Sequence, residues 1–289
     1  MDSRTRETGR RLLSSYYAQQ RGPIAYIDES FRGLEWPGEV PFYLLSAVLL
    51  DSSALSTTRE LYLETVGSDF WHTTKANRDK EYDLIDRFAT RVEVCSTEIW
   101  ISIQLDLRPE DLELARREAM LQLIEQLAQL GCTLAVYEQR NTRRRDASDA
   151  SLVNLARKSG LITGGIAVVG SKPWIEPLLW GPDLVCWRFR QALTGAFGRF
   201  TAFQTPAKVL DASGIYSLNE KRPETAAALN SGPVSPAPLF EAKAIRSSSS
   251  SMPNYQKQLQ DILHRLPRLV EPRLPPAELR SWLKKTFPN

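Results

Sequence analysis

The sequence predicts an α/β fold in which helices flank a mixed sheet. Residues 24–30 and 42–50 are apolar stretches separated by a turn-rich segment, which indicates an antiparallel pair of strands. A long helical pattern over residues 109–130 leads directly into an apolar strand pattern over residues 133–137. A helix followed at once by a buried strand indicates a crossover that returns to the same sheet. Hairpin and crossover connections together predict a sheet with both antiparallel and parallel strands.

The segment before residue 105 alternates between helix and strand patterns. Residues 1–21 are polar and predict a short helix or a frayed arm, and Pro23 marks the entry to the first strand. Residues 53–65 have helical spacing and a start rich in Ser and Thr, which suits an N-cap, and residues 80–89 predict another helix. A further pair of strands is expected at residues 92–94 and 100–103.

The clearest helix is expected to begin at Pro109 and to end before Gly131. Pro suits the first helical position, the acidic residues that follow favour the positive end of the helix, and apolar residues recur on one face. Later patterns predict a shorter helix over residues 152–158, a strand over residues 165–170, and a helix across the sheet in the aromatic stretch after Trp174.

The composition changes near residue 205. Residues 231–238 and 247–251 are linker-like, whereas residues 254–266 and 276–286 predict two amphipathic helices with basic faces. We therefore expect an N-terminal arm or helix over residues 1–21 and a main domain over residues 22–205. Residues 206–289 are expected to form a linker and accessory helices, as a partly irregular C-terminal tail.

Composition limits the class of protein. With 289 residues, of which 42% are hydrophobic, the chain can form a substantial core. No apolar run approaches the roughly 18 residues of a membrane span, and the start does not resemble a secretory signal, so we expect a cytoplasmic protein without a membrane partner. The 3 cysteines are widely spaced in apolar contexts, which favours reduced core residues. With only 2 histidines, a mechanism that needs a histidine cluster is disfavoured.

Three carboxylates stand out by their context. Asp28 and Glu138 each follow a predicted strand, and Asp183 lies in an otherwise apolar helical stretch. Strand ends of one sheet can meet on the same side, and an ionised carboxylate is costly to bury unless it meets a partner or a metal. Two alternatives stay open: residues 28–30 also suit a turn that leaves a sheet, and residues 181–183 also fit the start of a helix with Asp183 as its N-cap.

Oxygen ligands on a rigid sheet are the kind that Mg²⁺ and Mn²⁺ prefer. Two such ions about 4 Å apart can activate a water molecule and stabilise the leaving oxygen of a phosphodiester, and this chemistry needs no histidine. The acids could instead form structural salt bridges with the many arginines. The sequence thus predicts Mg²⁺ or Mn²⁺ as a cofactor and leaves a structural role open.

The formal net charge of +3 is unevenly distributed along the chain. Four arginines follow Glu138 closely: Arg140, Arg143, Arg144 and Arg145. Arginines can bind phosphates through two hydrogen bonds each, so they predict contacts with a nucleic-acid backbone. A solvated loop balanced by Asp146 and Asp149 explains the same residues, and either acid could cap the next helix or join the site. Lys75 and the neighbouring His72 could contact phosphate or be structural.

Several segments follow one another in a specific order. They are Tyr-Ile-Asp-Glu-Ser at residues 26–30, the strand at 44–48, Glu-Gln-Arg at 138–140, and Glu-Pro-Leu-Leu-Trp-Gly-Pro-Asp-Leu-Val-Cys at 176–186. Over residues 22–200 the chain resembles the bacterial family catalogued as domain of unknown function 3800. The resemblance implies a ribonuclease-H-like fold and a metal-dependent nuclease, with Asp28, Glu138 and Asp183 as metal ligands and Glu29 as an additional one. Pro182 stands where Ala is usual and Phe31 where Gly is common, and the proline could shift the start of the helix.

Together these features predict a Mg²⁺- or Mn²⁺-dependent nuclease or phosphodiester-processing protein of ribonuclease-H-like fold. Asp28, Glu138 and Asp183 are the expected catalytic residues, and RNA or DNA is the expected partner. The alternative is a non-catalytic module on the same fold that binds nucleic acid or protein, which the basic C-terminal segment and the substituted Pro182 would suit.

Overall fold

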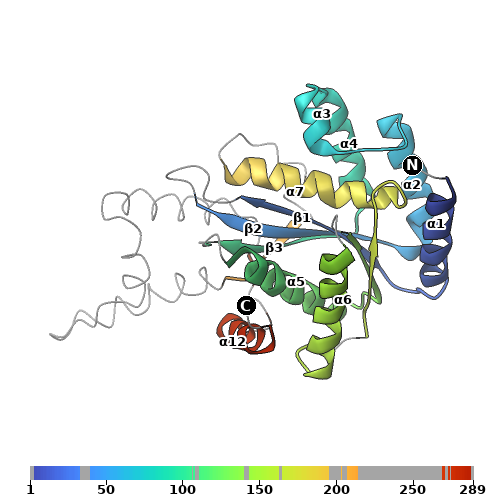
Figure 1. Ribbon diagram of the computed structural model, residues 1–289. Coiled ribbons are helices and arrows are strands. Elements are labelled where there is room, and N and C mark those ends of the chain that lie inside the picture. The colour runs from blue at the N-terminus through green and yellow to red at the C-terminus, as the bar shows by residue number, and fades with distance from the viewer. Residues whose placement is uncertain are drawn as a thin grey trace, which may run out of the picture.

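The structure is a computed structural model. It describes residues 3–32, 40–105, 107, 111–139, 143–162, 165–194, 203, 207–213, 269–270, 273 and 275–287, without the side chains of residues 3–5, 143–148, 150 and 269. Figure 1 shows a central sheet with helices on both of its faces. The predicted fold class, a mixed sheet flanked by helices, is confirmed.

The sheet has seven strands in the order β5-β4-β1-β2-β3-β6-β7. Their bounds are β1 Ile24–Arg32, β2 Phe42–Leu50, β3 Glu98–Leu105, β4 Leu134–Glu138, β5 Ala167–Ser171, β6 Ala207–Asp211 and β7 Leu269–Val270. β2 runs antiparallel to both β1 and β3, and the other neighbouring strands are parallel. Both the predicted antiparallel pair and the predicted return of residues 133–137 to the same sheet are confirmed.

The helices cover the sheet in two layers, each over its own buried core (Figure 1). One layer contains α7 (Trp180–Leu193), which packs on β1 and β2, with α2 (Leu55–Val66), α3 (Thr73–Arg78) and α4 (Tyr82–Cys95) beside it. The other layer contains α5 (Leu112–Gln129), α6 (Arg143–Lys158) and α12 (Pro276–Thr286). Helix α1 (Ser3–Tyr17) precedes the first strand, and two short 3₁₀ helices span Ser52–Ala54 and Pro177–Leu179.

The prediction of a strand at residues 92–94 was wrong, because these residues form the last turns of α4. Ile85, Phe88, Ala89 and Val92 are buried along one side of α4, with the spacing of an amphipathic helix. Val94 belongs to the opposite side and is exposed. A short run with two valines favours a strand locally, but packing of the whole helix face against the core overrides that preference.

Helix α5 is buried on almost every side because it lies between the sheet and α12. It leads into Gly131, whose φ of 78° is a left-handed conformation that glycine adopts without strain. The chain then enters β4 within three residues, so the helix and the strand form the predicted crossover unit. This crossover places the end of β4 next to β1.

The sheet continues beyond the boundary expected near residue 205. β6 pairs with β3, β7 pairs with β6, and α12 packs on α5, so parts of the segment 206–289 belong to the same core. The helix expected over residues 276–286 is present as α12, whereas the linkers at 231–238 and 247–251 and the helix over 254–266 lie outside the described residues. In the part of the chain that the structure describes, no helix has the length and apolar character needed to cross a membrane.

Candidate carboxylate site

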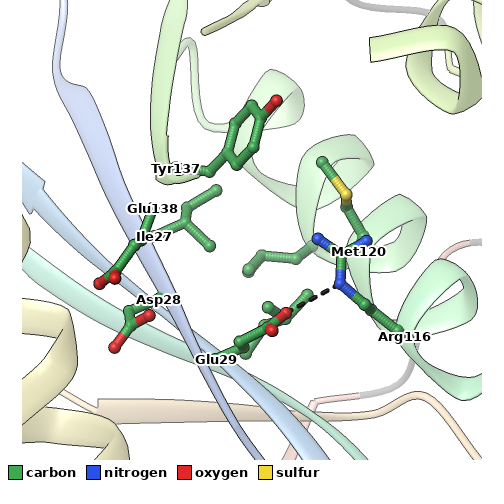
Figure 2. A pocket seen from close by; sticks show the side chains of 9 residues that line it. Ile27, Asp28, Glu29, Arg116, Met120, Tyr137 and Glu138 are labelled. Atoms are coloured by element: carbon green, nitrogen blue, oxygen red, sulfur yellow. Dashed lines mark hydrogen bonds and ion pairs between the residues drawn. The ribbon is translucent and has the colours of Figure 1, made fainter. Parts of the chain in front are cut away.

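Strand alternation places Asp28 and Glu138 on the same face of the sheet. Successive side chains of a strand point to opposite faces. Tyr26 and Val136, two residues before each acid, belong to the core under α7, and β1 and β4 are paired in parallel up to Ile27 and Tyr137. Asp28 and Glu138 are the next residues of two adjacent strands. Figure 2 shows their carboxyl groups turned toward one another.

Helix α7 brings Asp183 to the same place. The hydroxyl of Ser46 on β2 donates to the carbonyl of Pro182 at 2.9 Å, and the thiol of Cys186 donates to the carbonyl of Asp28 at 3.4 Å. These contacts fix the first turns of α7 over the middle of β1 and β2. Pro182 is the third residue of α7, where no backbone N–H is needed for the helix, so it does not disturb the helix start.

The N-cap alternative for Asp183 does not describe its contacts. Helix α7 begins at Trp180, and Asp183 lies in its first turn. One carboxylate oxygen, Oδ2, accepts hydrogen bonds from the backbone N–H and from the hydroxyl of Thr73, both at 2.7 Å. Asp183 is thus bound by another element, the start of α3, and not by its own helix.

Burial disfavours ionisation of all three carboxyl groups. Burial raises the pKa of Asp28 well above its usual value, and the charges of Glu138 and Asp183 raise it further. Burial and then the charge of Asp183 raise the pKa of Glu138 to about 7. Burial also raises the pKa of Asp183, although His72 and the two Thr73 hydrogen bonds act in the opposite direction.

The carboxyl groups of Asp28 and Glu138 lie close together, and the charge of Glu138 raises the pKa of Asp28. The charge of Asp183 acts on both of them in the same direction. The site therefore gathers three carboxyl groups whose negative charges are costly to keep together.

Glu29 points to the opposite face of the sheet. The guanidinium of Arg116 on α5 donates to Glu29 at 2.8 Å, and the hydroxyl of Tyr43 also donates to it. The same guanidinium binds both carboxylate oxygens of Asp149 on α6, a pair that is almost fully buried. Figure 2 shows Glu29 directed at Arg116 and away from Asp28 and Glu138. Its carboxylate thus belongs to an ion-pair network behind the site, on the α5 side of the sheet.

A small pocket lies between β1, β4 and α5, next to these carboxylates (Figure 2). It is lined by Ile27, Asp28, Glu29, Leu45, Arg116, Met120, Leu123, Tyr137 and Glu138. Its walls are mostly apolar, and its charged residues are the site carboxylates and the Glu29–Arg116 ion pair.

The predicted basic residues are only partly described. Arg140 lies outside the described residues, and Arg143, Arg144 and Arg145 form the first turn of α6 without described side chains. Lys75 is on the exposed side of α3, where it forms an ion pair with Asp79 at 2.6 Å. His72 is exposed as well, and its Nδ1 accepts from the backbone N–H of Thr74 at the start of α3.

Three further residues near the carboxylates were not predicted from the sequence. Thr73 binds Asp183, and the indole N–H of Trp71 donates to the Thr73 hydroxyl at 2.9 Å. Lys172, directly after β5, donates to the carbonyl of Gln139 at 2.6 Å, and its charge lowers the pKa of Glu138. No local pattern identifies them, because Thr73 and Asp183 are 110 residues apart.

The donor types of the site fit a hard divalent cation. The charges of Glu138 and Asp183 both raise the pKa of Asp28, and a cation among these three carboxylates would offset the repulsion. In the described part of the chain, however, no three His, Cys, Asp or Glu side chains are gathered closely enough to form a metal-binding group as they stand. The chemistry of the donors therefore suits Mg²⁺ or Mn²⁺, and a small convergence of the side chains would have to accompany binding.

Glu138 ends β4 as predicted, but the prediction that Asp28 ends its strand was wrong, because β1 continues to Arg32 through pairing with β2. The fold and the site define an α/β protein with a carboxylate cluster on one face of a mixed sheet. No protein-family model and no curated protein matches the chain, so its resemblance to the family of domain of unknown function 3800 stays a prediction. Among solved structures, the chain is similar to Bst-RNase HIII in complex with Mn²⁺, with a TM-score of 0.34 and 12% identity over 87% of this chain and 74% of the other. It is also similar to a chain of the PCNA:RNase HII complex from Archaeoglobus fulgidus, with a TM-score of 0.34 and 16% identity over 75% and 98% of the two chains. At these identities and TM-scores the likeness assigns no activity to this chain.

Proposed function

We propose that this protein is a Mg²⁺- or Mn²⁺-dependent nuclease or a related phosphodiester-processing enzyme. The observation that carries the proposal is the placement of Asp28 and Glu138 on one face of the sheet with Asp183 close to both, each with a raised pKa. Burial and the charges of Glu138 and Asp183 disfavour ionisation of Asp28, and a divalent cation would neutralise this unfavourable charge. The resemblance of residues 26–30, 138–140 and 176–186 to the family of domain of unknown function 3800 supports the same proposal of a metal-dependent nuclease.

In this proposal Asp28, Glu138 and Asp183 would hold the cation. A cation in such a site would activate a water molecule and stabilise charge on a phosphate. The protein's own groups keep the site in place: Ser46 and Cys186 anchor α7 to the middle of β2 and β1, and Lys172 supplies a positive charge near Glu138. Glu29 is not included among the ligands, because it is paired with Arg116 on the other face.

Nucleic acid is the proposed substrate. Helix α6 begins at Arg143, five residues after Glu138, so Arg140, Arg143, Arg144 and Arg145 follow the site closely along the chain. Arginines there would bind a phosphate backbone, with an affinity that falls as the salt concentration rises. Lys75, on α3 next to Thr73, is a further candidate for such contacts.

Cleavage of labelled single- and double-stranded RNA, DNA and hybrid tests the proposal. The purified protein is assayed with Mn²⁺, Mg²⁺ or EDTA, beside the variant Asp28→Asn and the control Asp83→Asn, which changes an exposed acid on α4. We expect metal-dependent cutting by the wild-type and control proteins and at least a 100-fold loss in Asp28→Asn, in the range that removal of a metal ligand or its support produces. Calorimetric titration with Mn²⁺ gives a readout that does not depend on activity.

Two other outcomes would contradict the proposal that this protein is a metal-dependent enzyme. Equal binding of Mn²⁺ by wild type and Asp28→Asn would exclude Asp28 as a ligand. Retention of nucleic acid without cutting, with equal affinity in both proteins and a steep dependence on salt, would favour the alternative of a non-catalytic binding module.

A further inference from the structure

We infer that Thr73 is a positioning residue, which fixes the carboxylate of Asp183 in one orientation and presents its other oxygen to Asp28 and Glu138. The inference deepens the proposed function, on which its consequence for metal binding rests. Thr73 and Asp183 come from different helices, α3 and α7, and they meet at two hydrogen bonds of 2.7 Å.

The direction of the hydroxyl proton of Thr73 follows from its second neighbour. The indole N–H of Trp71 can only donate, so the oxygen of Thr73 accepts this hydrogen bond at 2.9 Å. The hydroxyl proton is then available for Asp183, whose oxygen Oδ2 lies 2.7 Å away. The chain of hydrogen bonds thus runs in one direction, from Trp71 through Thr73 to Asp183.

Trp71 and Thr73, the first two residues of this series of hydrogen bonds, are held rigidly. Trp71 is 4% exposed, and its ring packs edge to face on Phe88 of α4, with ring centroids 4.9 Å apart. Thr73 is fully buried, and its backbone N–H, the first of α3, is the second donor to Asp183. Two donors from one buried residue define both the position and the rotation of the carboxylate.

The two carboxylate oxygens of Asp183 therefore differ in their hydrogen bonds to Thr73. Oδ2 receives two hydrogen bonds from Thr73, whereas Oδ1 receives none from this residue. Both donors stabilise negative charge on Oδ2. The carboxylate of Asp183 is thus held at one of its oxygens by Thr73, and this contact sets its orientation.

Groups that hold a metal ligand in place change metal affinity by about 10- to 100-fold when they are removed. The variant Thr73→Val keeps the shape of the side chain and removes the hydroxyl. Thr73→Ser keeps both donors to Asp183. Thr58→Val is a matched control, because Thr58 is an equally buried threonine on α2.

The first measurement is the affinity for Mn²⁺ by calorimetric titration, together with kcat and KM on whichever substrate the wild type cuts. We expect Thr73→Val to weaken Mn²⁺ binding by about 10- to 100-fold and to lower kcat more than it raises KM. Thr73→Ser should recover most of this loss, and Thr58→Val should bind Mn²⁺ like the wild type. Equal affinities of wild type and Thr73→Val would overturn the inference.

The second measurement is a pair of crystal structures, of the wild type and of Thr73→Val, without metal. We expect one orientation of the Asp183 carboxylate in the wild type. In the variant we expect this carboxylate to be rotated or to occupy two alternative orientations. An unchanged Asp183 in Thr73→Val would overturn the inference, whether or not the protein binds a metal. If the wild type neither binds Mn²⁺ nor cuts nucleic acid, the proposed function fails, and the crystal structures still decide the role of Thr73.

Discussion

Replacing Glu138 by Gln removes one charge from a cluster in which three carboxylates repel one another. The variant Glu138→Gln should stabilise the metal-free protein at pH 8, although it removes a candidate catalytic group. The side chain keeps its shape, and a neutral amide next to Asp28 no longer competes with it for a proton.

The magnitude follows from the raised pKa of Glu138, which moves from 4.5 to about 7 on folding. At about 1.4 kcal/mol per pH unit, this corresponds to ~3 kcal/mol, mainly from burial and from the charge of Asp183. Because the folded-state pKa is the higher one, the folded protein keeps a proton that the unfolded chain releases. Stability therefore falls as the pH rises from 4.5 to about 7, and the full cost is present above pH 7.

Urea unfolding at pH 5 and pH 8 in EDTA measures this effect, with the exposed Glu60→Gln on α2 as the control. We expect Glu138→Gln to be more stable than wild type by up to ~3 kcal/mol at pH 8, with a smaller difference at pH 5. A gain of this size raises the melting temperature by roughly 6 °C, at about 2 °C per kcal/mol for a chain of this length. Mn²⁺ should then stabilise the wild type and not the variant. A variant that is equal to wild type or less stable at pH 8 would refute the charge repulsion.

Three other predictions concern the site and its support. Mn²⁺ affinity, measured by titration between pH 5 and pH 8, should rise with pH up to about 7 as Glu138 loses its proton, and a flat profile would contradict a metal bound there. Arg280→Ala should lower the free energy of unfolding by about 1–3 kcal/mol, because it removes two hydrogen bonds to the buried Glu118, which keeps the one from Gln104, whereas the exposed Lys284→Ala should change it by less than about 0.5 kcal/mol. Arg116→Ala should cost ~3–5 kcal/mol in the same urea assay, since it removes the buried guanidinium that binds both Glu29 and Asp149 behind β1, and a loss below about 1 kcal/mol would show that the network does not hold the strand.

The central part of the fold could be predicted because its signals are local. The antiparallel pair β1 and β2 and the crossover through α5 to β4 are each encoded by neighbouring segments and a short turn. Residues 92–94 show the limit of such reasoning, since three residues of strand-forming type belong to a helix face that is completed by Ile85, Phe88 and Ala89. β6 and β7 were missed because they are short and pair with strands far away in sequence.

The site was predictable to a similar extent. The strand-end argument holds for Glu138, whereas Asp28 lies in the middle of β1 because pairing with β2 extends that strand to Arg32. Strand alternation would have placed Glu29 on the opposite face, where it meets Arg116. The contact between Thr73 and Asp183 could not be foreseen, because it depends on how the helices inserted between β2 and β3 pack against α7. Whether Asp28, Glu138 and Asp183 act together on a metal stays a prediction, to be decided by the titrations described above.

The ion pair between Glu118 and Arg280 has a consequence for how the chain folds during synthesis. The two residues are 162 positions apart, and Glu118 is 1% exposed once α12 covers it. A ribosome adds about 5–20 residues per second, so α5 waits roughly 8–30 s before its partner helix has been made. During that interval the apolar surface of α5 that later receives Leu279 and Leu283 is open to solvent and to chaperones. We therefore expect this surface of α5 to resist proteolysis only after α12 has been made, and not when the first strands form.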